Sequence, residues 1–323
     1  VEKLIGKKIL SIETGKIAKQ ADGAALVRYG DTMVLATAVS APEEKEEADF
    51  FPLTVDYREK TYAAGKFPGG FFKREGRPTL KEILTMRLID RPVRPLFPET
   101  YLREVQIMSM VLSADKENDP DILAMVGASA ALSVSSIPFG GPTGSVRVGQ
   151  INGEFVVNPT HTELAMSSMD LVVSGTEEAV TMVEASGKEV PEEQMVDAIM
   201  FGHAFIKEIV LLQKELLAKC GKEKQHVPPL KLDMALLDEI KEKYYSEILE
   251  KNQTPGKDAR KRALNEILNQ IINEYCIDKD GVPAKKTIKT IFERIETIAV
   301  RDQIVQEGKR PDGRGLEDIR PIT

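Results

Sequence analysis

The residues most suited to chemistry lie in one short stretch, KFPGGFFKREGRP, at positions 66–78. Its glycines free the backbone and its prolines exclude regular structure, so the stretch predicts a loop. Soluble proteins usually bury phenylalanine, and a phenylalanine pair on a charged loop is therefore unusual. The bases of a single nucleic-acid strand stack on aromatic rings, and its phosphates attract cations. The candidate nucleic-acid contacts are Phe71, Phe72, Lys73, Arg74 and Arg77.

A second interpretation of this loop stays open at the level of sequence. In it, the rings of Phe71 and Phe72 pack onto the core and only fix the loop. Stacking of a base on an aromatic ring contributes only about 1–3 kcal/mol, so composition does not decide between the two interpretations.

Residues 79–94 have the spacing of an amphipathic helix, which Pro92 and Pro95 are expected to end. Arginines recur on one face at i, i+4 and i+7. A row of guanidinium groups beside a basic loop is typical of a phosphate-binding surface, and ion pairs with nearby carboxylates are the alternative. The apolar stripe consists of Leu80, Ile83, Leu84 and Leu88, and the arginine row of Arg87, Arg91 and Arg94.

Charge is distributed unevenly along the chain. Residues 58–94 contain ten cationic and four anionic side chains, a local balance of +6, whereas the formal net charge of the 323 residues is -7. This contrast indicates a local anion site rather than a generally basic protein.

The remaining composition is that of an ordinary globular protein of about two domains. No apolar run is long enough to span a bilayer and no signal peptide opens the sequence, so no membrane partner and a cytoplasmic location are expected. Cys220 and Cys276 are interpreted as reduced thiols. The three histidines form no ligand pattern, and neither a zinc site nor a Ser-His-Asp arrangement is predicted.

The elements that would position the loop are strands with tight turns and two long helices. The helix at 122–136 is small and apolar on most sides, with Asp121 as its expected cap, and the helix at 191–219 is amphipathic. Together they predict an α+β domain with a mixed, mainly antiparallel sheet and helices packed on it. Strands are predicted at 8–14, 24–29, 32–41, 53–57, 104–113, 145–151, 154–157, 169–174 and 179–184.

The second half of the chain has a different character. Residues 222–232 are charged and contain prolines, which predicts a linker after a first domain at 1–221. Residues 233–306 show only helical periodicity, at 234–249, 257–276 and 283–306, and predict a small all-α domain. Its Lys and Glu faces are interpreted as solvated, with an RNA surface as the alternative.

Four motifs in order, TYAAGK at 61–66, FFKREGRP at 71–78, RLIDRP at 87–92 and RPLFP at 94–98, closely resemble bacterial polynucleotide phosphorylase. The RPDGR motif at 310–314 resembles the opening of a ribonuclease-PH-type domain, so residues 307–323 would begin a truncated second such domain. The resemblance implies that the phenylalanine loop lines the entrance of a trimer's central channel and grips RNA. Arg91 and Arg94 would then face phosphates deeper in the channel, and Arg147 is a further candidate whose alternative is an exposed strand charge. Lys73 replaces the usual first arginine, which keeps the charge but loses a bidentate fork.

The resemblance also implies a reaction, phosphorolysis of RNA to nucleoside diphosphates and its reversal, with inorganic phosphate and Mg²⁺ as cofactors of the full enzyme. The position of the family's phosphate cradle has Asn118, Asp119, Pro120 and Asp121 here, which repel phosphate and remove a donor. The family's metal-binding aspartates are absent from 161–168, and Asp170 is interpreted as structural. No catalytic or metal-binding residue, and no bound cofactor, is therefore expected in this chain.

These inferences predict the RNA-binding and assembly half of a polyribonucleotide nucleotidyltransferase, a 3′–5′ exoribonuclease of mRNA degradation. Its expected partners are single-stranded RNA, further copies in a homotrimer, and an RNA-degradation complex. The alternative is a non-catalytic RNA-binding or oligomerisation module with a regulatory nucleotide site at the same arginines.

Overall fold

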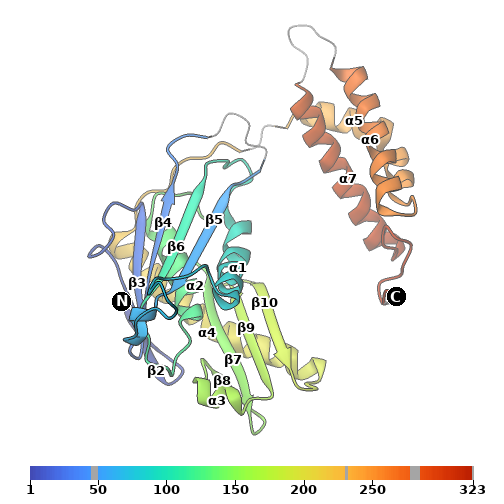
Figure 1. The fold of residues 1–323 in the computed structure, drawn as a ribbon. Helices are drawn as coiled ribbons and strands as arrows, with labels where there is room; N and C mark the ends of the chain where they lie inside the picture. Colours follow the sequence, from blue (N-terminus) through green and yellow to red (C-terminus); the bar gives the residue numbers. More distant parts are fainter. Residues whose placement is uncertain (45–49, 230–231, 277–283, 322–323) are drawn as a thin grey trace. The chain divides into compact units, whose positions relative to one another are not determined.

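A computed structural model describes residues 1–44, 50–229, 232–276 and 284–321 of the chain. The chain divides into two compact units, Val1–Pro229 and Leu230–Thr323 (Figure 1). Among the described residues, no helix is long and apolar enough to cross a membrane.

The first unit begins with a six-stranded sheet in the order β1-β2-β3-β4-β6-β5. Neighbouring strands are antiparallel except β5 and β6, which are parallel. The strands are β1 (Glu2–Ile5), β2 (Lys8–Glu13), β3 (Gly23–Tyr29), β4 (Thr32–Ser40), β5 (Leu53–Glu59) and β6 (Val105–Ser113).

The parallel pair requires a crossover, and this crossover carries the phenylalanine loop. After β5 the chain forms a short 3₁₀ turn, η1 (Thr61–Ala64), then the loop, then helix α1 (Leu80–Val93), and a second 3₁₀ turn, η2 (Arg94–Leu96). Helix α1 packs on β5. The loop therefore begins and ends on elements that the sheet holds in place.

A second, four-stranded antiparallel sheet has the order β10-β9-β7-β8. Helix α2 (Pro120–Val134) packs on β3, β4 and β6 of the first sheet, and helix α4 (Glu192–Cys220) packs on β7 and β9 of the second. The two helices also contact each other. The remaining elements are β7 (Gly144–Ile151), β8 (Glu154–Val157), α3 (His161–Ala165), β9 (Met169–Gly175) and β10 (Val180–Gly187).

Every residue of α2 is buried, as its run of small apolar side chains predicts. A Cβ atom added at Gly127 would lie 3.0 Å from the Cβ of Ala36, so glycine allows the helix to approach β4 closely. The predicted α+β class, with a mixed sheet and packed helices followed by a helical region, is confirmed.

Several local details differ from the sequence prediction, among them the short helix α3, which was not predicted. The edge strand β1 was not predicted, because it is only four residues long and half of it is exposed. Pro92 lies inside α1, and the helix ends at Val93. The N-cap of α2 is Asp119 rather than Asp121, since Pro120 occupies the first helical position.

The segment at 222–229, predicted as part of a linker, packs on the first unit. The amide of Lys222 donates to the carbonyl of Val134, and that of Gln225 donates to Ser136. Lys224 Nζ donates to three carbonyls at the end of α2, those of Leu132, Ser133 and Ser135, at 2.8–2.9 Å. The division between the units therefore falls after Pro229, and residues 230 and 231 lie outside the described residues.

The second unit consists of α5 (Met234–Asn252), α6 (Lys257–Tyr275) and α7 (Lys285–Glu307). It has its own core, in which Ile240, Ile248, Ile271 and Ile291 are fully buried. Residue 283, the predicted start of the last helix, lies outside the described residues, as do 322 and 323 of the terminal segment. After α7, Lys309 and Gly315 form an isolated antiparallel bridge.

Candidate nucleic-acid interface

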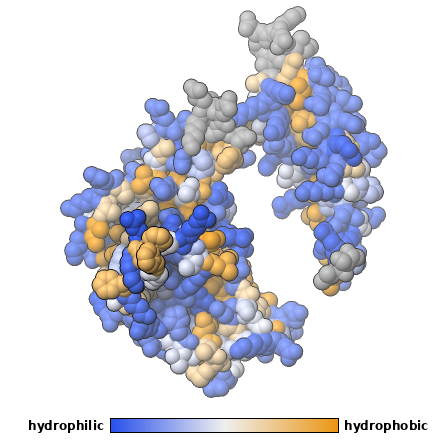
Figure 2. Space-filling model, viewed as in Figure 1, coloured by the Kyte–Doolittle hydropathy of each residue, from blue (hydrophilic) through white to orange (hydrophobic). Residues whose placement is uncertain are grey.

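The phenylalanine pair lies on the surface. Phe71 is 93% exposed and Phe72 81% exposed, and their ring centroids are 5.5 Å apart in an edge-to-face arrangement. The interpretation that both rings pack onto the core is therefore wrong. In Figure 2, orange side chains are interspersed with blue ones over the part of the first unit where η1 and the following loop lie in Figure 1. A third ring of the same loop, Phe67, is 92% exposed and was not among the candidates, although its place in the motif could have indicated it.

The loop is anchored by polar contacts of its flanks rather than by its rings. Glu75 accepts hydrogen bonds from the amide and the hydroxyl of Thr61, at 3.0 and 2.9 Å. Gly70 and Lys73 have positive φ angles of 73° and 52°. Left-handed backbone is uncommon at a non-glycine residue such as Lys73. The hydrogen bonds between Thr61 and Glu75 hold the loop in this conformation.

Three cations of this loop, Lys73, Arg74 and Arg77, have no carboxylate partner among the described residues. Among the described residues, no hydrogen bond or ion pair engages the side chains of Lys73, Arg74 or Arg77, and all three are exposed. A phosphate could therefore approach them without displacing an existing ion pair. The loop offers aromatic faces and free positive charge together.

The start of α1 is fixed to both β5 and the loop. Thr79 and Glu82 form a capping box, in which the amide of Thr79 donates to Glu82 at 2.6 Å. The other oxygen of Glu82 accepts from the amide of Glu59 in β5, at 2.9 Å. Burial alone would raise the pKa of Glu82, but these hydrogen bonds lower it below its usual value. The carboxylate thus stays charged and ties the helix start to the sheet.

Three of the four residues of the apolar stripe of α1 do not face the core, whereas Leu88 packs against it. Leu80, Ile83 and Leu84 are 72%, 45% and 49% exposed. The face that packs on the unit carries Glu82, Thr85 and Ile89 instead, together with Pro92 and Val93. Helical spacing gave the correct element but not the face that it buries.

Two arginines of the predicted row, Arg91 of α1 and Arg94 of η2, are already paired. Arg91 donates to Glu184 of β10. Arg94 pairs with Asp90 at 2.8 Å and also donates to the carbonyls of Phe51 and Leu53, both at 3.2 Å. The alternative interpretation, ion pairs with nearby carboxylates, therefore describes both residues in this structure.

A cavity of about 290 Å³ lies between α1 and the second sheet. It is lined by Arg87, Arg91 and Arg147, and also by Asp170 and Glu184, the ion-pair partners of Arg147 and Arg91. Arg87 is exposed and has no ion-pair partner within the described parts of the chain. Arg87 belongs to the predicted arginine row but was not among the candidate site residues. The phenylalanine loop and Arg94 do not line this cavity.

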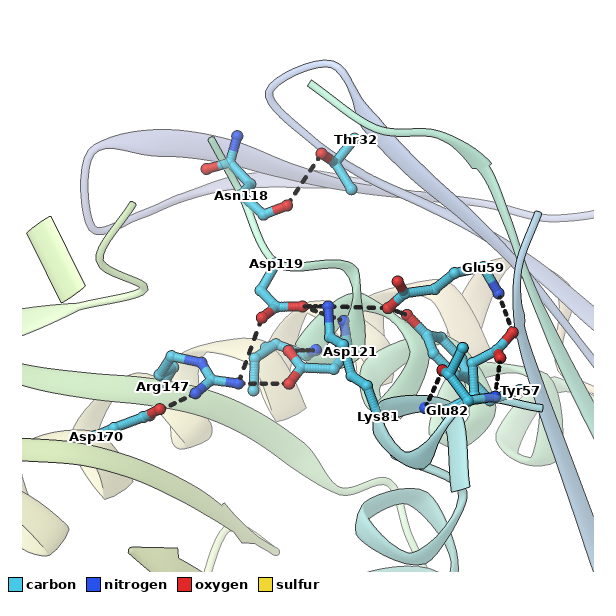
Figure 3. A network of polar contacts seen from close by, with 12 residues as sticks. Thr32, Tyr57, Glu59, Lys81, Glu82, Asn118, Asp119, Asp121, Arg147 and Asp170 are labelled. Atoms are coloured by element: carbon cyan, nitrogen blue, oxygen red, sulfur yellow. Dashed lines mark hydrogen bonds and ion pairs between the residues drawn. The ribbon is translucent and has the colours of Figure 1, made fainter. Parts of the chain in front are cut away.

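Arg147 of β7 is buried, so its interpretation as an exposed strand charge is wrong (Figure 3). Its guanidinium donates to Asp121 of α2 and to Asp170 of β9, and a third carboxylate, that of Asp119, lies 3.8 Å away. Burial raises the pKa of Asp121 to about 6, although the charge of Arg147 opposes this shift. The three carboxylates raise the pKa of Arg147 against its burial.

The same network continues toward β5. Lys81 Nζ lies 3.1 Å from Asp119 and 3.0 Å from Glu59, and the hydroxyl of Tyr57 donates to Glu59 at 2.7 Å. Burial lowers the pKa of Lys81, but the two carboxylates outweigh it and raise the pKa overall. The network thus connects α1, α2 and both sheets.

These residues do not fit a phosphate or a magnesium ion. At the start of α2, where the family resemblance would place a phosphate cradle, Asp119 and Asp121 present negative charge and Pro120 has no N–H group. The carboxylates that could bind a cation are held by Arg147 and Lys81. Among the described residues, no group of three or more His, Cys, Asp or Glu could hold a metal ion.

Comparison with known proteins first defines a class. Residues 8–138 match the family model "3' exoribonuclease family, domain 1", and residues 141–204 match domain 2 of the same family. Among solved structures, rice Rrp46 has a TM-score of 0.54 at 17% identity, covering 64% of this chain and 94% of that one. An archaeal exosome core has a TM-score of 0.51 at 17% identity, covering 64% of this chain and 86% of that one. At this identity the likeness shows the fold alone.

Residues 235–315 match the model "Polyribonucleotide nucleotidyltransferase, RNA binding domain". The polyribonucleotide nucleotidyltransferase of Exiguobacterium sibiricum is 47% identical over 98% of this chain and 43% of its own length. That of Bacillus subtilis is 46% identical over 98% of this chain and 45% of its own length. The chain belongs to the polyribonucleotide nucleotidyltransferase family and corresponds to its N-terminal portion. It spans less than half the length of these relatives.

Proposed function

We propose that this chain is the RNA-binding and assembly part of a phosphate-dependent 3′–5′ exoribonuclease, which converts RNA to nucleoside diphosphates and can run in reverse. The observation that carries the proposal is the exposed pair Phe71 and Phe72 beside cations that have no carboxylate partner among the described residues. Phosphate contacts there require no ion pair among the described residues to break, and bases can stack on the exposed rings.

The chemical step belongs to a part of the protein outside this chain. Mg²⁺ would neutralise charge on the phosphate groups there, and inorganic phosphate would be the attacking group. In this chain Arg147 and Lys81 already hold the carboxylates. We therefore expect no release of ADP when the chain alone is mixed with oligo(A), phosphate and Mg²⁺. Release of ADP would place an active centre in this chain.

The expected partners are single-stranded RNA, two further copies in a homotrimer, and an RNA-degradation complex, all in the cytoplasm. The exposed stripe of Leu80, Ile83 and Leu84 supports assembly, because a row of exposed apolar side chains is typical of a surface that another chain covers. Sedimentation of the chain would test the trimer.

The binding proposal is tested by oligo(A) affinity at low salt. Phe71→Ala and Phe72→Ala should each weaken binding by about 1–3 kcal/mol, roughly 5- to 150-fold. Phe50→Ala is the matched control, because Phe50 is also exposed, at 69%, but lies outside the loop. A fall in the melting temperature without a loss of affinity would contradict the proposal.

A second candidate function is a regulatory nucleotide site. The cavity that contains Arg87 and Arg91 favours it, since Arg87 has no ion-pair partner among the described residues. If Arg87→Ala weakens AMP binding as much as oligo(A) binding, the cavity takes a single nucleotide. If only oligo(A) binding falls, the cavity contacts a strand.

A further inference from the structure

The loop at 66–78 makes few contacts with the rest of the molecule. The amide of Lys66 donates to the carbonyl of Thr61 at 3.1 Å, and the only other hydrogen bonds that join the loop to described residues outside it are those of Glu75. The three rings of the loop are 81–93% exposed. A free loop adopts many conformations, and ordering it on a ligand costs free energy. A contact that fixes the loop beforehand therefore favours binding.

Thr61 is the fixed side of the contact with Glu75. It begins the 3₁₀ turn η1, which packs on β6. The amide of Ala114, just after β6, donates to the carbonyl of Ala63 at 3.0 Å. The hydroxyl of Tyr62 donates to the sulfur of a methionine of β6 at 3.2 Å. The six-stranded sheet thus holds the turn in place.

Glu75 connects the far end of the loop to this turn. Its Oε1 atom accepts from both the amide and the hydroxyl of Thr61, at 3.0 and 2.9 Å. Hydrogen bonds to an ionised carboxylate are stronger than those between neutral groups. The contact spans 14 positions of sequence, and it therefore closes most of the loop against the sheet.

The arginines of the loop lie on either side of Glu75 in the sequence. Arg74 precedes it directly and Arg77 follows two positions later, and neither side chain has a hydrogen bond or ion pair among the described residues. A carboxylate so near in the sequence could pair with either guanidinium, and such a pair would compete with a phosphate. Because Glu75 binds Thr61 instead, both arginines stay available to an anion.

We infer that Glu75 is a positioning residue for RNA, which through Thr61 holds the phenylalanine loop in the shape that receives a strand and leaves Arg74 and Arg77 free for phosphates. Glu75 itself does not contact RNA. Its negative charge is unfavourable beside a phosphate, and the ordered loop offsets this cost. The inference rests on the proposed function and deepens it, since it adds a residue that acts on the same site.

The sign of the effect of Glu75→Ala separates positioning from electrostatics. If Glu75 only repels phosphate, removal of its charge should strengthen oligo(A) binding at low salt. If it positions the loop, the variant should bind oligo(A) about three- to tenfold more weakly, because the loop must then be ordered on binding. Glu99→Ala is the matched control, since Glu99 is also exposed, lies outside the loop and has no ion pair among the described residues.

Conservative variants test the contact itself. A glutamine oxygen still accepts from Thr61 while the charge is removed, so Glu75→Gln should bind oligo(A) at least as tightly as the wild type. Thr61→Val keeps the amide donor and removes the hydroxyl, so it should lose part of the affinity, and Thr61→Ser should restore it. Hydrogen exchange of the amide of residue 61 should be faster in Glu75→Ala but not in Glu75→Gln.

Phe72→Ala, measured alongside, separates failure of this inference from failure of the proposed function. If Phe72→Ala does not weaken oligo(A) binding, the loop does not bind RNA and both are wrong. If Phe72→Ala weakens binding but Glu75→Ala leaves it unchanged or strengthens it, only the positioning role is overturned. Equal weakening by Glu75→Ala and Glu99→Ala would overturn it as well.

Discussion

At the residue scale, Arg147 lies beside the start of α2, where the family resemblance would place a phosphate. Its guanidinium lies between carboxylates of α2 and β9, which come from different layers of the fold. A buried arginine with two carboxylate partners stabilises the arrangement only while both partners remain. We therefore assign Arg147 a structural role rather than contact with RNA.

Replacement of Arg147 tests this role. Arg147→Met should reduce the free energy of unfolding by about 3–5 kcal/mol, because the buried Asp121 would lose its partner and would either take up a proton or remain an unpaired charge. Oligo(A) affinity, measured where the variant is folded, should not change. Adding Asp121→Leu should recover part of the lost stability, since no unpaired buried charge remains. A stable variant with weakened RNA binding would instead make Arg147 an RNA contact.

The shifted pKa of Asp121 predicts a pH dependence. Its folded value of about 6 lies above the ordinary 3.8, so the folded state binds the proton more tightly than the unfolded state. The resulting contribution to stability is fully present below about pH 3.8 and is lost as the pH rises through about 6. Urea unfolding from pH 4 to 7.5 should show stability falling more steeply in the wild type than in Asp121→Asn. Parallel curves would contradict the shift.

The residues of the loop could be predicted from sequence, and those of the network could not. Phe71 and Phe72 stand out because an apolar pair beside cations is unusual wherever it occurs, and the structure exposes both. Arg147 and Asp121 are 26 positions apart and meet only because β7 and the start of α2 lie side by side. A single sequence contains no signal for that pairing.

At the element scale, Lys224 closes the C-terminus of α2. The last carbonyls of a helix have no partners within the helix, and a cation there also interacts favourably with the helix dipole. Burial lowers the pKa of Lys224 to about 8, yet its ammonium serves three carbonyls. This contact attaches residues 222–229 to the first unit.

Lys224→Met should therefore lower the free energy of unfolding of the first unit by about 1–3 kcal/mol, because buried carbonyls lose their donor. Lys222→Met is the matched control. The exposed Lys222 ammonium donates to one carbonyl only, that of Asp22 at 2.7 Å, so a smaller loss is expected. Equal losses in chemical denaturation would argue against a capping role.

Helices, strands and turns could be predicted from the sequence where the residues of one short segment determine the conformation. Asn152 and Gly153 both have positive φ, as a tight hairpin turn requires, and they join β7 to β8 as expected. The face of α1 was not predictable, because its exposed leucines and its buried Glu82 reverse the usual pattern. Hydrogen bonds to Glu59 and Thr79 compensate the burial of Glu82, and these depend on the position of β5.

At the scale of the whole molecule, the chain contains two separate hydrophobic cores. The core of the first unit is built on the two sheets, and that of the second on α5, α6 and α7. Each unit thus has the main requirement for folding on its own. Helical periodicity in the sequence indicated the second unit, but the last contacts of the first unit, at 222–229, follow only from the structure.

Two cores predict two unfolding transitions in the full chain. Ile291→Ala removes a fully buried side chain of the second unit and should cost about 2–5 kcal/mol there. Ile107→Ala is the matched change in the first unit, where Ile107 is also fully buried. Hydrogen exchange should show faster opening only in α5, α6 and α7 for the first variant, and only in the strands and helices of 1–229 for the second. If either change speeds exchange in both units equally, the chain unfolds as one cooperative body and the separate cores do not act independently.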